Sequence, residues 1–137
     1  MPRQDDIEVL REHGINPSAQ RVAVARYVLH TDEHPTADEV LTRVKRRFPQ
    51  ISRATVYNTL NLFVEVGLLR QFTLSEGRLV FDPRTEDHHH FIDDATGEIQ
   101  DVPWDAIKVS NVSGLEGLDV REYQVVMRGR KSPRTSQ

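Results

Sequence analysis

The chain has 137 residues, 37% of them hydrophobic, which is enough for one ordinary domain or two very small ones. It contains no cysteine, and this excludes disulfides, thiolate zinc sites and cysteine nucleophiles, so that any metal must be held by His, Asp or Glu. The net charge of −3 argues against a uniformly basic nucleic-acid binder. The polar start and the lack of any apolar run near the roughly 18 residues that span a bilayer favour a cytoplasmic protein.

The charge is unevenly distributed along the chain. Residues 1–75 carry 10 basic and 9 acidic side chains, hence +1, whereas residues 76–137 carry 8 and 12, hence −4. The first half is the better nucleic-acid candidate. Because its excess is small, local placement of Arg21, Arg26, Arg53 and residues 45–47 must supply the attraction.

Three helices are predicted in the first 48 residues. Residues 4–13 form a short one that ends at Gly14, and residues 18–30 form a second with apolar side chains at helical spacing. Residues 36–48 form the third, because Thr36 and the glutamate three positions later make a capping box.

Residues 52–66 are predicted to form a fourth helix, N-capped by Ser52. Two strands follow, residues 68–74 and 78–82, joined by a turn at Ser75, Glu76 and Gly77. Helices followed by a two-stranded hairpin describe a winged helix-turn-helix over residues 1–83.

The pattern changes beyond Pro83. Strands are predicted at residues 89–92, 98–102 and 120–128, and residues 132–137 are expected to be a tail. The resulting unit, residues 84–131, is too small to be stable alone and is expected to pair with a second copy of itself.

The outward face of the fourth helix suits DNA reading. Arg53 can reach a phosphate or a guanine, and Tyr57, one turn on, can pack against a thymine methyl. Asn58 and Asn61 lie on the same face. A merely solvated helix face is the alternative, but the preceding helices and the following hairpin favour DNA binding.

A run of three histidines marks a candidate metal site. His88 and His90 project to the same side of a strand, and His89 projects to the other. Asp82 and Asp101 add carboxylates on either side in sequence. Neutral imidazole and carboxylate are good ligands for divalent transition metals when thiolate is missing. Structural or surface histidines are the alternative, although three in a row are harder to explain that way.

Five segments together resemble the ferric uptake regulator superfamily of bacterial metal-dependent repressors over nearly the whole chain. They are Gly14–Arg21, His34–Ala37, Ser52–Leu60, Phe81–Asp82 and Asp87–His90. The resemblance implies an α+β fold with an N-terminal winged helix-turn-helix, a C-terminal α/β dimerisation and metal-sensing domain, and a regulatory metal in the hinge between them.

Residue by residue, the resemblance implies both a ligand set and a DNA-contacting set. The implied metal ligands are His34, Asp82, His88, His90 and Asp101. Aspartate at position 101 resembles the peroxide-sensing PerR branch. The implied DNA-contacting residues are Arg21, Arg53, Thr55, Tyr57, Asn58 and Asn61. The tyrosine that contacts a base in the family corresponds to Tyr57, and the arginine that contacts the DNA backbone corresponds to Arg21.

The chain also departs from the family pattern. The paired cysteines of the structural zinc site are replaced around residues 92–97, and a glycine-rich stretch at residues 113–118 stands where relatives have a longer helix. These features and the triple histidine also resemble the haem-responsive Irr branch, although its cysteine-based haem motif is missing. Asp87 and His89 could form a second metal or haem site, but Lys108 falls where a carboxylate is expected.

These observations predict a homodimeric, metal-dependent transcriptional repressor that binds a pseudo-palindromic double-stranded operator. Fe²⁺ or Mn²⁺ is the expected ion, Zn²⁺ would bind in vitro, and peroxide or iron is the expected signal. Haem sensing is the first alternative. A metal-independent DNA-binding adaptor and a small metalloenzyme with a metal-activated water are more remote, and for the enzyme neither a pocket nor a general base is evident.

Overall fold

The structure, a computed structural model, describes residues 5–74 and 77–132. The chain divides into two compact units, Met1–Thr85 (the N-terminal unit) and Glu86–Gln137 (the C-terminal unit). Three predicted features lie outside the described residues: the helix start at Gln4, the turn residues Ser75 and Glu76, and the tail beyond Ser132.

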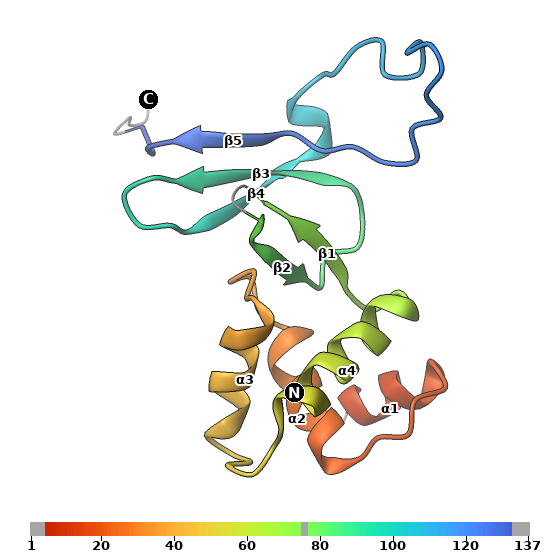
Figure 1. The fold of residues 1–137 in the computed structure, drawn as a ribbon, viewed down its shortest axis with the longest axis vertical. Helices are drawn as coiled ribbons and strands as arrows, with labels where there is room; N and C mark the ends of the chain where they lie inside the picture. The colour runs from red at the N-terminus through yellow and green to blue at the C-terminus, as the bar shows by residue number, and fades with distance from the viewer. Residues whose placement is uncertain (1–4, 75–76, 133–137) are drawn as a thin grey trace. The chain divides into compact units, whose positions relative to one another are not determined.

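The described part of the N-terminal unit contains four α-helices close to the predicted positions (Figure 1). They are α1 (Asp5–Glu12), α2 (Ala19–Val28), α3 (Ala37–Lys45) and α4 (Arg53–Glu65). The third helix was predicted to end at Phe48, but it ends at Lys45. The residues after it form a turn, in which the N–H groups of Arg47 and Phe48 both donate to the carbonyl of Val44 at 3.0 Å. The α conformation is disfavoured just before Pro49, which explains the earlier end.

Side-chain caps start the last three helices where the sequence predicts them. The hydroxyl oxygens of Ser18, Thr36 and Ser52 each accept a backbone N–H from the first turn. At Thr36 the capping box is complete, because its own N–H donates to the carboxylate of Glu39 at 2.9 Å. Each cap satisfies a donor that the helix itself leaves unpaired.

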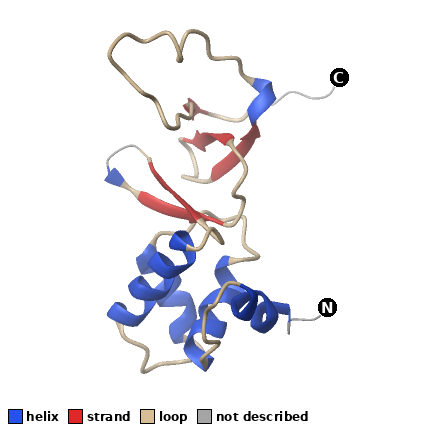
Figure 2. Cartoon of the chain, turned by 90° about the vertical axis from the view of Figure 1, so that its right-hand side faces the viewer, coloured by secondary structure: helices blue, strands red, loops and turns tan. Residues whose placement is uncertain are grey.

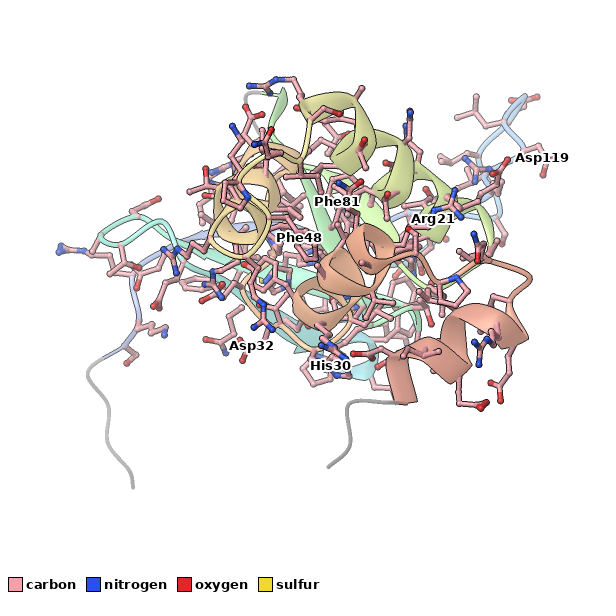
Figure 3. All side chains as sticks on the ribbon, turned by 90° about the horizontal axis from the view of Figure 1, so that it is seen from below. Arg21, His30, Asp32, Phe48, Phe81 and Asp119 are labelled. Carbon is pink, nitrogen blue, oxygen red and sulfur yellow. The ribbon has the colours of Figure 1, made fainter. Side chains whose placement is uncertain are left out.

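Apolar side chains from all four helices form one core. Phe81 lies in this core with only 3% of its surface exposed, and the partly buried Phe48 packs against the core (Figure 3). The fully buried members of this core are Leu10, Val24, Ala25, Val40, Val56, Leu60 and Phe63. This packing holds α4 in place and leaves its polar face outward.

A two-stranded wing follows α4. Gly67, at φ +87°, ends that helix in a backbone conformation that L side chains rarely adopt. Strands β1 (Arg70–Thr73) and β2 (Leu79–Asp82) then pair antiparallel. The N–H of Phe81 donates to the carbonyl of Pro35 at 2.9 Å, tying β2 to the segment that leads into α3. The predicted winged helix-turn-helix is confirmed.

The described part of the C-terminal unit is a three-stranded sheet with a long loop. Its strands are β3 (His88–Asp93), β4 (Ile99–Pro103) and β5 (Val126–Gly129), in the order β4-β3-β5. β3 pairs antiparallel with β4 and parallel with β5. One 3₁₀ turn, η2 (Trp104–Ala106), follows β4. Figure 2 shows the contrast between the helical N-terminal unit and this strand-and-loop unit.

The last strand is shorter than the prediction of residues 120–128. Val126 pairs with His90, so continuing the register backwards would set residues 120–123 opposite the loop before β3. A segment with no strand beside it cannot complete its backbone hydrogen bonds as sheet. The strand therefore starts at Val126.

Among residues 5–74 and 77–132, no helix combines the length and the apolar character needed to cross a membrane.

Candidate metal-binding and DNA-reading sites

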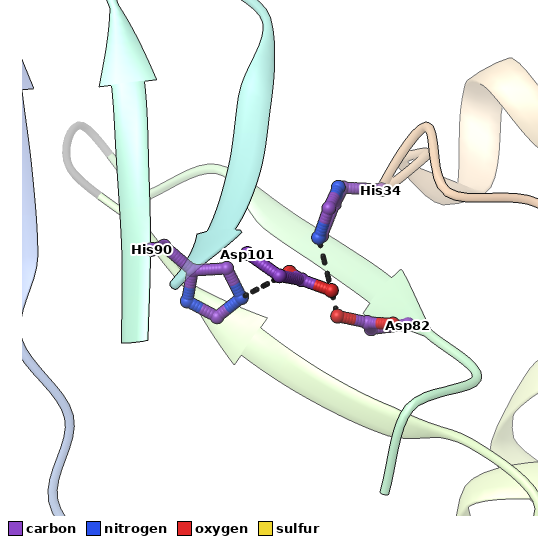
Figure 4. A group of neighbouring side chains, drawn as sticks. All are labelled: His34, Asp82, His90 and Asp101. Carbon is purple, nitrogen blue, oxygen red and sulfur yellow. Dashed lines mark ion pairs between the residues drawn. The ribbon is translucent and has the colours of Figure 1, made fainter. Parts of the chain in front are cut away.

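In the N-terminal unit, a histidine and an aspartate meet where the wing approaches the start of α3. Nε2 of His34 lies 3.2 Å from Oδ2 of Asp82 (Figure 4), and both residues are buried, at 3% and 2% exposure. Their neighbours in sequence, Pro35 and Phe81, share a backbone hydrogen bond, which aligns the two segments. Thus β2 brings Asp82 to a residue 48 positions earlier in the chain.

His34 has an unusual backbone conformation. Its φ is +54°, in the left-handed region that few non-glycine residues occupy. Such a conformation costs on the order of 1 kcal/mol or more and is concentrated at functional sites. The fold nevertheless holds His34 there, with its imidazole turned toward Asp82.

In the C-terminal unit, two histidines converge on one carboxylate. His90 is paired in register with Asp101 across β3 and β4, and His88 lies two residues earlier on the same side. Their Nε2 atoms are 3.4 Å (His88) and 3.7 Å (His90) from Oδ1 of Asp101. Figure 4 shows His90 beside Asp101. Both imidazoles are buried, so this polar group is shielded from water.

The hydrogen-bond partners of the two Nδ1 atoms indicate which nitrogen of each ring carries the proton. Nδ1 of His88 donates to the carbonyl of Glu86 at 2.7 Å, and Nδ1 of His90 donates to Oε1 of Gln124 at 2.7 Å. Since both partners accept, each neutral ring presents its Nε2 lone pair toward Asp101. Two lone pairs and a carboxylate that converge in this way attract a cation, and oxygen acceptors of this kind commonly orient metal-binding histidines.

His89 points to the other face of β3. Its Nδ1 accepts the N–H of Val125 at 3.0 Å, and its ring stacks on Trp104 with centroids 4.5 Å apart. Its Nε2 is buried and has no hydrogen-bond partner in the part of the chain that the structure describes. Asp87 and Lys108, the other residues considered for a second site, are exposed. His89 is therefore not part of the His88, His90 and Asp101 group.

The helix predicted to read DNA presents its polar residues outward. Arg53, Tyr57, Asn58 and Asn61 are all exposed, Tyr57 with 38% of its surface accessible. Thr55 is half-buried, and its hydroxyl accepts from that of Ser52 at 2.9 Å.

Arg21 on α2 (Figure 3) is half-buried, and its guanidinium donates to the carbonyl of Asn16 at 3.1 Å. That bond fixes the side chain close to the start of its helix.

Asp38 of α3 contacts this face, although sequence reasoning did not identify it. Its Oδ1 accepts from Nη1 of Arg53 and, at 3.1 Å, from the hydroxyl of Tyr57. The hydrogen bond from Arg53, and then that from Tyr57, lowers the pKa of Asp38, and the same carboxylate raises the pKa of Arg53. The residues are 15 and 19 positions apart, so only the packing of α3 against α4 reveals the contact.

Comparison with known proteins adds three findings. The family described as "Ferric uptake regulator family" matches residues 12–128. The peroxide-responsive repressor PerR of Staphylococcus epidermidis is 37% identical over 98 residues, which are 72% of this chain and 65% of that protein. This chain thus matches slightly less than two thirds of the length of that curated relative.

Solved structures show the same fold. The Vibrio cholerae ferric uptake regulator aligns with a TM-score of 0.71 at 22% identity, covering 91% of this chain and 98% of that one. A Campylobacter jejuni peroxide stress regulator aligns with a TM-score of 0.65 at 26% identity, covering 94% and 98%.

Proposed function

The chain belongs to the ferric uptake regulator family, and we propose that it is a metal-dependent, DNA-binding transcriptional repressor that responds to peroxide or iron. The observation that carries the proposal is the buried convergence of His88, His90 and Asp101, with both Nε2 atoms directed at the carboxylate. A regulator with a peroxide signal is supported by the similarity to PerR. Family membership also favours a regulator over an enzyme.

Five side chains would hold the regulatory ion. The C-terminal unit contributes His88, His90 and Asp101, and the N-terminal unit contributes His34 and Asp82. The family resemblance implies this set, and the two buried groups within the separate units support it. When bound, the ion would supply positive charge and a fixed link between ligands of the two units. The unbound chain would have no such link.

The donor set suits a first-row divalent ion. Three imidazole nitrogens and two carboxylates, without thiolate, are compatible with Fe²⁺ or Mn²⁺, and Zn²⁺ would bind more tightly in vitro. Nδ1 of His88 and Nδ1 of His90 each face an oxygen acceptor, which leaves Nε2 as the nitrogen that would bind the ion.

DNA recognition would use two copies of the chain. Each α4 would enter one major groove, so that a two-fold dimer reads a pseudo-palindromic operator. The DNA-contacting residues we propose are Arg21, Arg53, Thr55, Tyr57, Asn58 and Asn61. The C-terminal unit would form the dimer, because its loop exposes apolar side chains that a partner could cover: Leu115, Leu118, Val120 and Tyr123.

Ligand substitutions test this proposal. The variants His34→Ala and Asp101→Ala should fold and dimerise, yet the gain in operator affinity on adding Mn²⁺ should fall by at least about tenfold. Loss of a metal ligand weakens metal binding more than loss of a residue that only hydrogen-bonds to a ligand. Matched controls are His13→Ala and Asp105→Ala, which alter exposed residues outside the ligand set. Metal-dependent operator binding that persists in both ligand variants would contradict the proposed site.

Haem sensing through the three histidines has less support. Each imidazole is at least 98% buried, and the ring of His89 is already stacked on Trp104. A haem iron would have to reach a ring nitrogen, but Nδ1 of His89 accepts the N–H of Val125 and its Nε2 is buried. A Soret band on adding haem that His88→Ala and His89→Ala both abolish would favour the haem alternative, whereas a band that persists in both variants would count against it.

A further inference from the structure

We propose that Asp38 is a positioning residue that sets the DNA specificity of α4 by orienting Arg53 and Tyr57. The inference rests on the proposed function, because it takes α4 as the helix that reads the operator. It assigns to α3 a part in sequence discrimination, in addition to supporting the recognition helix.

One carboxylate oxygen organises both side chains. Oδ1 of Asp38 accepts from Nη1 of Arg53 and from the phenol of Tyr57, whose oxygen lies 3.1 Å away. The guanidinium carbon of Arg53 lies 5.9 Å from the centre of the Tyr57 ring. Arg53 and Tyr57 are one turn apart on α4, whereas Asp38 reaches them from the first turn of α3.

The arrangement leaves most of the guanidinium available. Arginine has five N–H donors in a planar fork, and the bond to Asp38 uses Nη1. The remaining edge of the fork can still donate to a guanine, which it recognises best when its plane is fixed. A carboxylate that fixes the fork in the free protein reduces the conformational freedom that would otherwise be lost on binding.

The same contact weakens binding to DNA of arbitrary sequence. Such binding is dominated by basic side chains that neutralise phosphates. Arg53 is exposed and would be a ready phosphate contact, but Asp38 already pairs with it and adds a negative charge beside it. Asp38 therefore disfavours contact between Arg53 and a DNA phosphate, and it keeps the Arg53 side chain in the orientation that suits recognition of a base.

Substituting Asp38 separates these effects. The probes are the Mn²⁺-loaded protein, an operator duplex selected from a random pool by the wild-type protein, and a shuffled duplex of equal length. Asp38→Asn should raise affinity for the shuffled duplex and lower the operator-to-shuffled ratio about tenfold, the scale expected for losing a well-placed arginine contact. The salt slope for the shuffled duplex should steepen by about one unit as Arg53 gains a phosphate. Asp38→Ala, which removes the acceptor altogether, should act in the same direction.

Two controls distinguish positioning from bulk charge. Glu65→Gln removes the same charge from an exposed site at the end of α4 and should leave the operator-to-shuffled ratio unchanged. In a background that carries both Arg53→Gln and Tyr57→Phe, Asp38→Asn should no longer change the ratio, because both donors that it orients are gone.

The outcomes separate this inference from the proposed function. If the wild-type protein shows no preference for any selected duplex, the proposed function fails. If the wild type discriminates while Asp38→Asn and Asp38→Ala keep its ratio, or if Glu65→Gln lowers the ratio as much, the role of Asp38 is overturned. Melting curves that match the wild type confirm that the exposed substitutions leave the fold intact.

Discussion

At the scale of single residues, Tyr27 shows how local packing changes a titration. Its hydroxyl donates to Glu33 at 2.6 Å, and the guanidinium of Arg43 lies 4.4 Å above its ring. Burial, followed by the hydrogen bond to Glu33, raises the pKa of Tyr27 to about 12. The folded state therefore favours the neutral phenol. Its contribution to stability is complete below the ordinary tyrosine pKa of about 10 and is lost as pH rises through about 12.

Tyrosinate absorbance tests this shift. Tyr27→Phe should remove the rise at 295 nm that develops near pH 12, because no other side chain replaces that phenol. The matched control, Tyr123→Phe, alters an exposed tyrosine of the C-terminal unit and should retain the phase near pH 12. Retention of the phase in Tyr27→Phe would show that Glu33 and burial do not hold the proton on Tyr27.

The residues of the candidate metal group could be predicted only in part. The alternation of a strand was enough to place His88 and His90 on one side and His89 on the other. Gln124 could not be found in this way, because it reaches His90 across a separation of 34 residues. His34 was identified as a ligand only through the family resemblance, because a single histidine before a helix belongs to no periodic pattern in the sequence.

At the scale of elements, the start of α3 depends on signals that lie within four residues. Thr36 and Glu39 each satisfy the other's backbone N–H, at 3.2 and 2.9 Å. Starts of this kind were predictable, as they were for Ser18 and Ser52. The start of β5 was not, because its partner strand β3 lies far back in the chain and the register with it decides where β5 begins.

Removing the α3 cap should destabilise the N-terminal unit. Thr36→Ala leaves backbone donors unsatisfied and should lower the free energy of unfolding by about 1 kcal/mol, measured by urea denaturation followed by circular dichroism. Thr42→Ala is the matched control, since Thr42 is exposed on the same helix and alanine favours helix. Equal stability of Thr36→Ala and the wild type would mean that the capping box contributes little.

At the scale of the whole molecule, the proposed metal ligands are divided between two units. The N-terminal unit holds α4, which we propose reads DNA, together with His34 and Asp82, and the C-terminal unit holds His88, His90 and Asp101. The small C-terminal unit has no cysteine for the zinc site of the family, so a dimer formed through it would depend on apolar contacts.

Operator binding by the purified protein, followed by fluorescence anisotropy without oxygen, shows whether a bound metal ion controls its affinity for DNA. Titration with Mn²⁺ or Fe²⁺ should promote binding to the selected duplex, and peroxide should abolish binding only of the Fe²⁺-loaded protein. Binding by the metal-free protein that is as tight as with either ion would contradict metal-dependent control of DNA binding, and release of that protein by haem would favour the haem-responsive alternative.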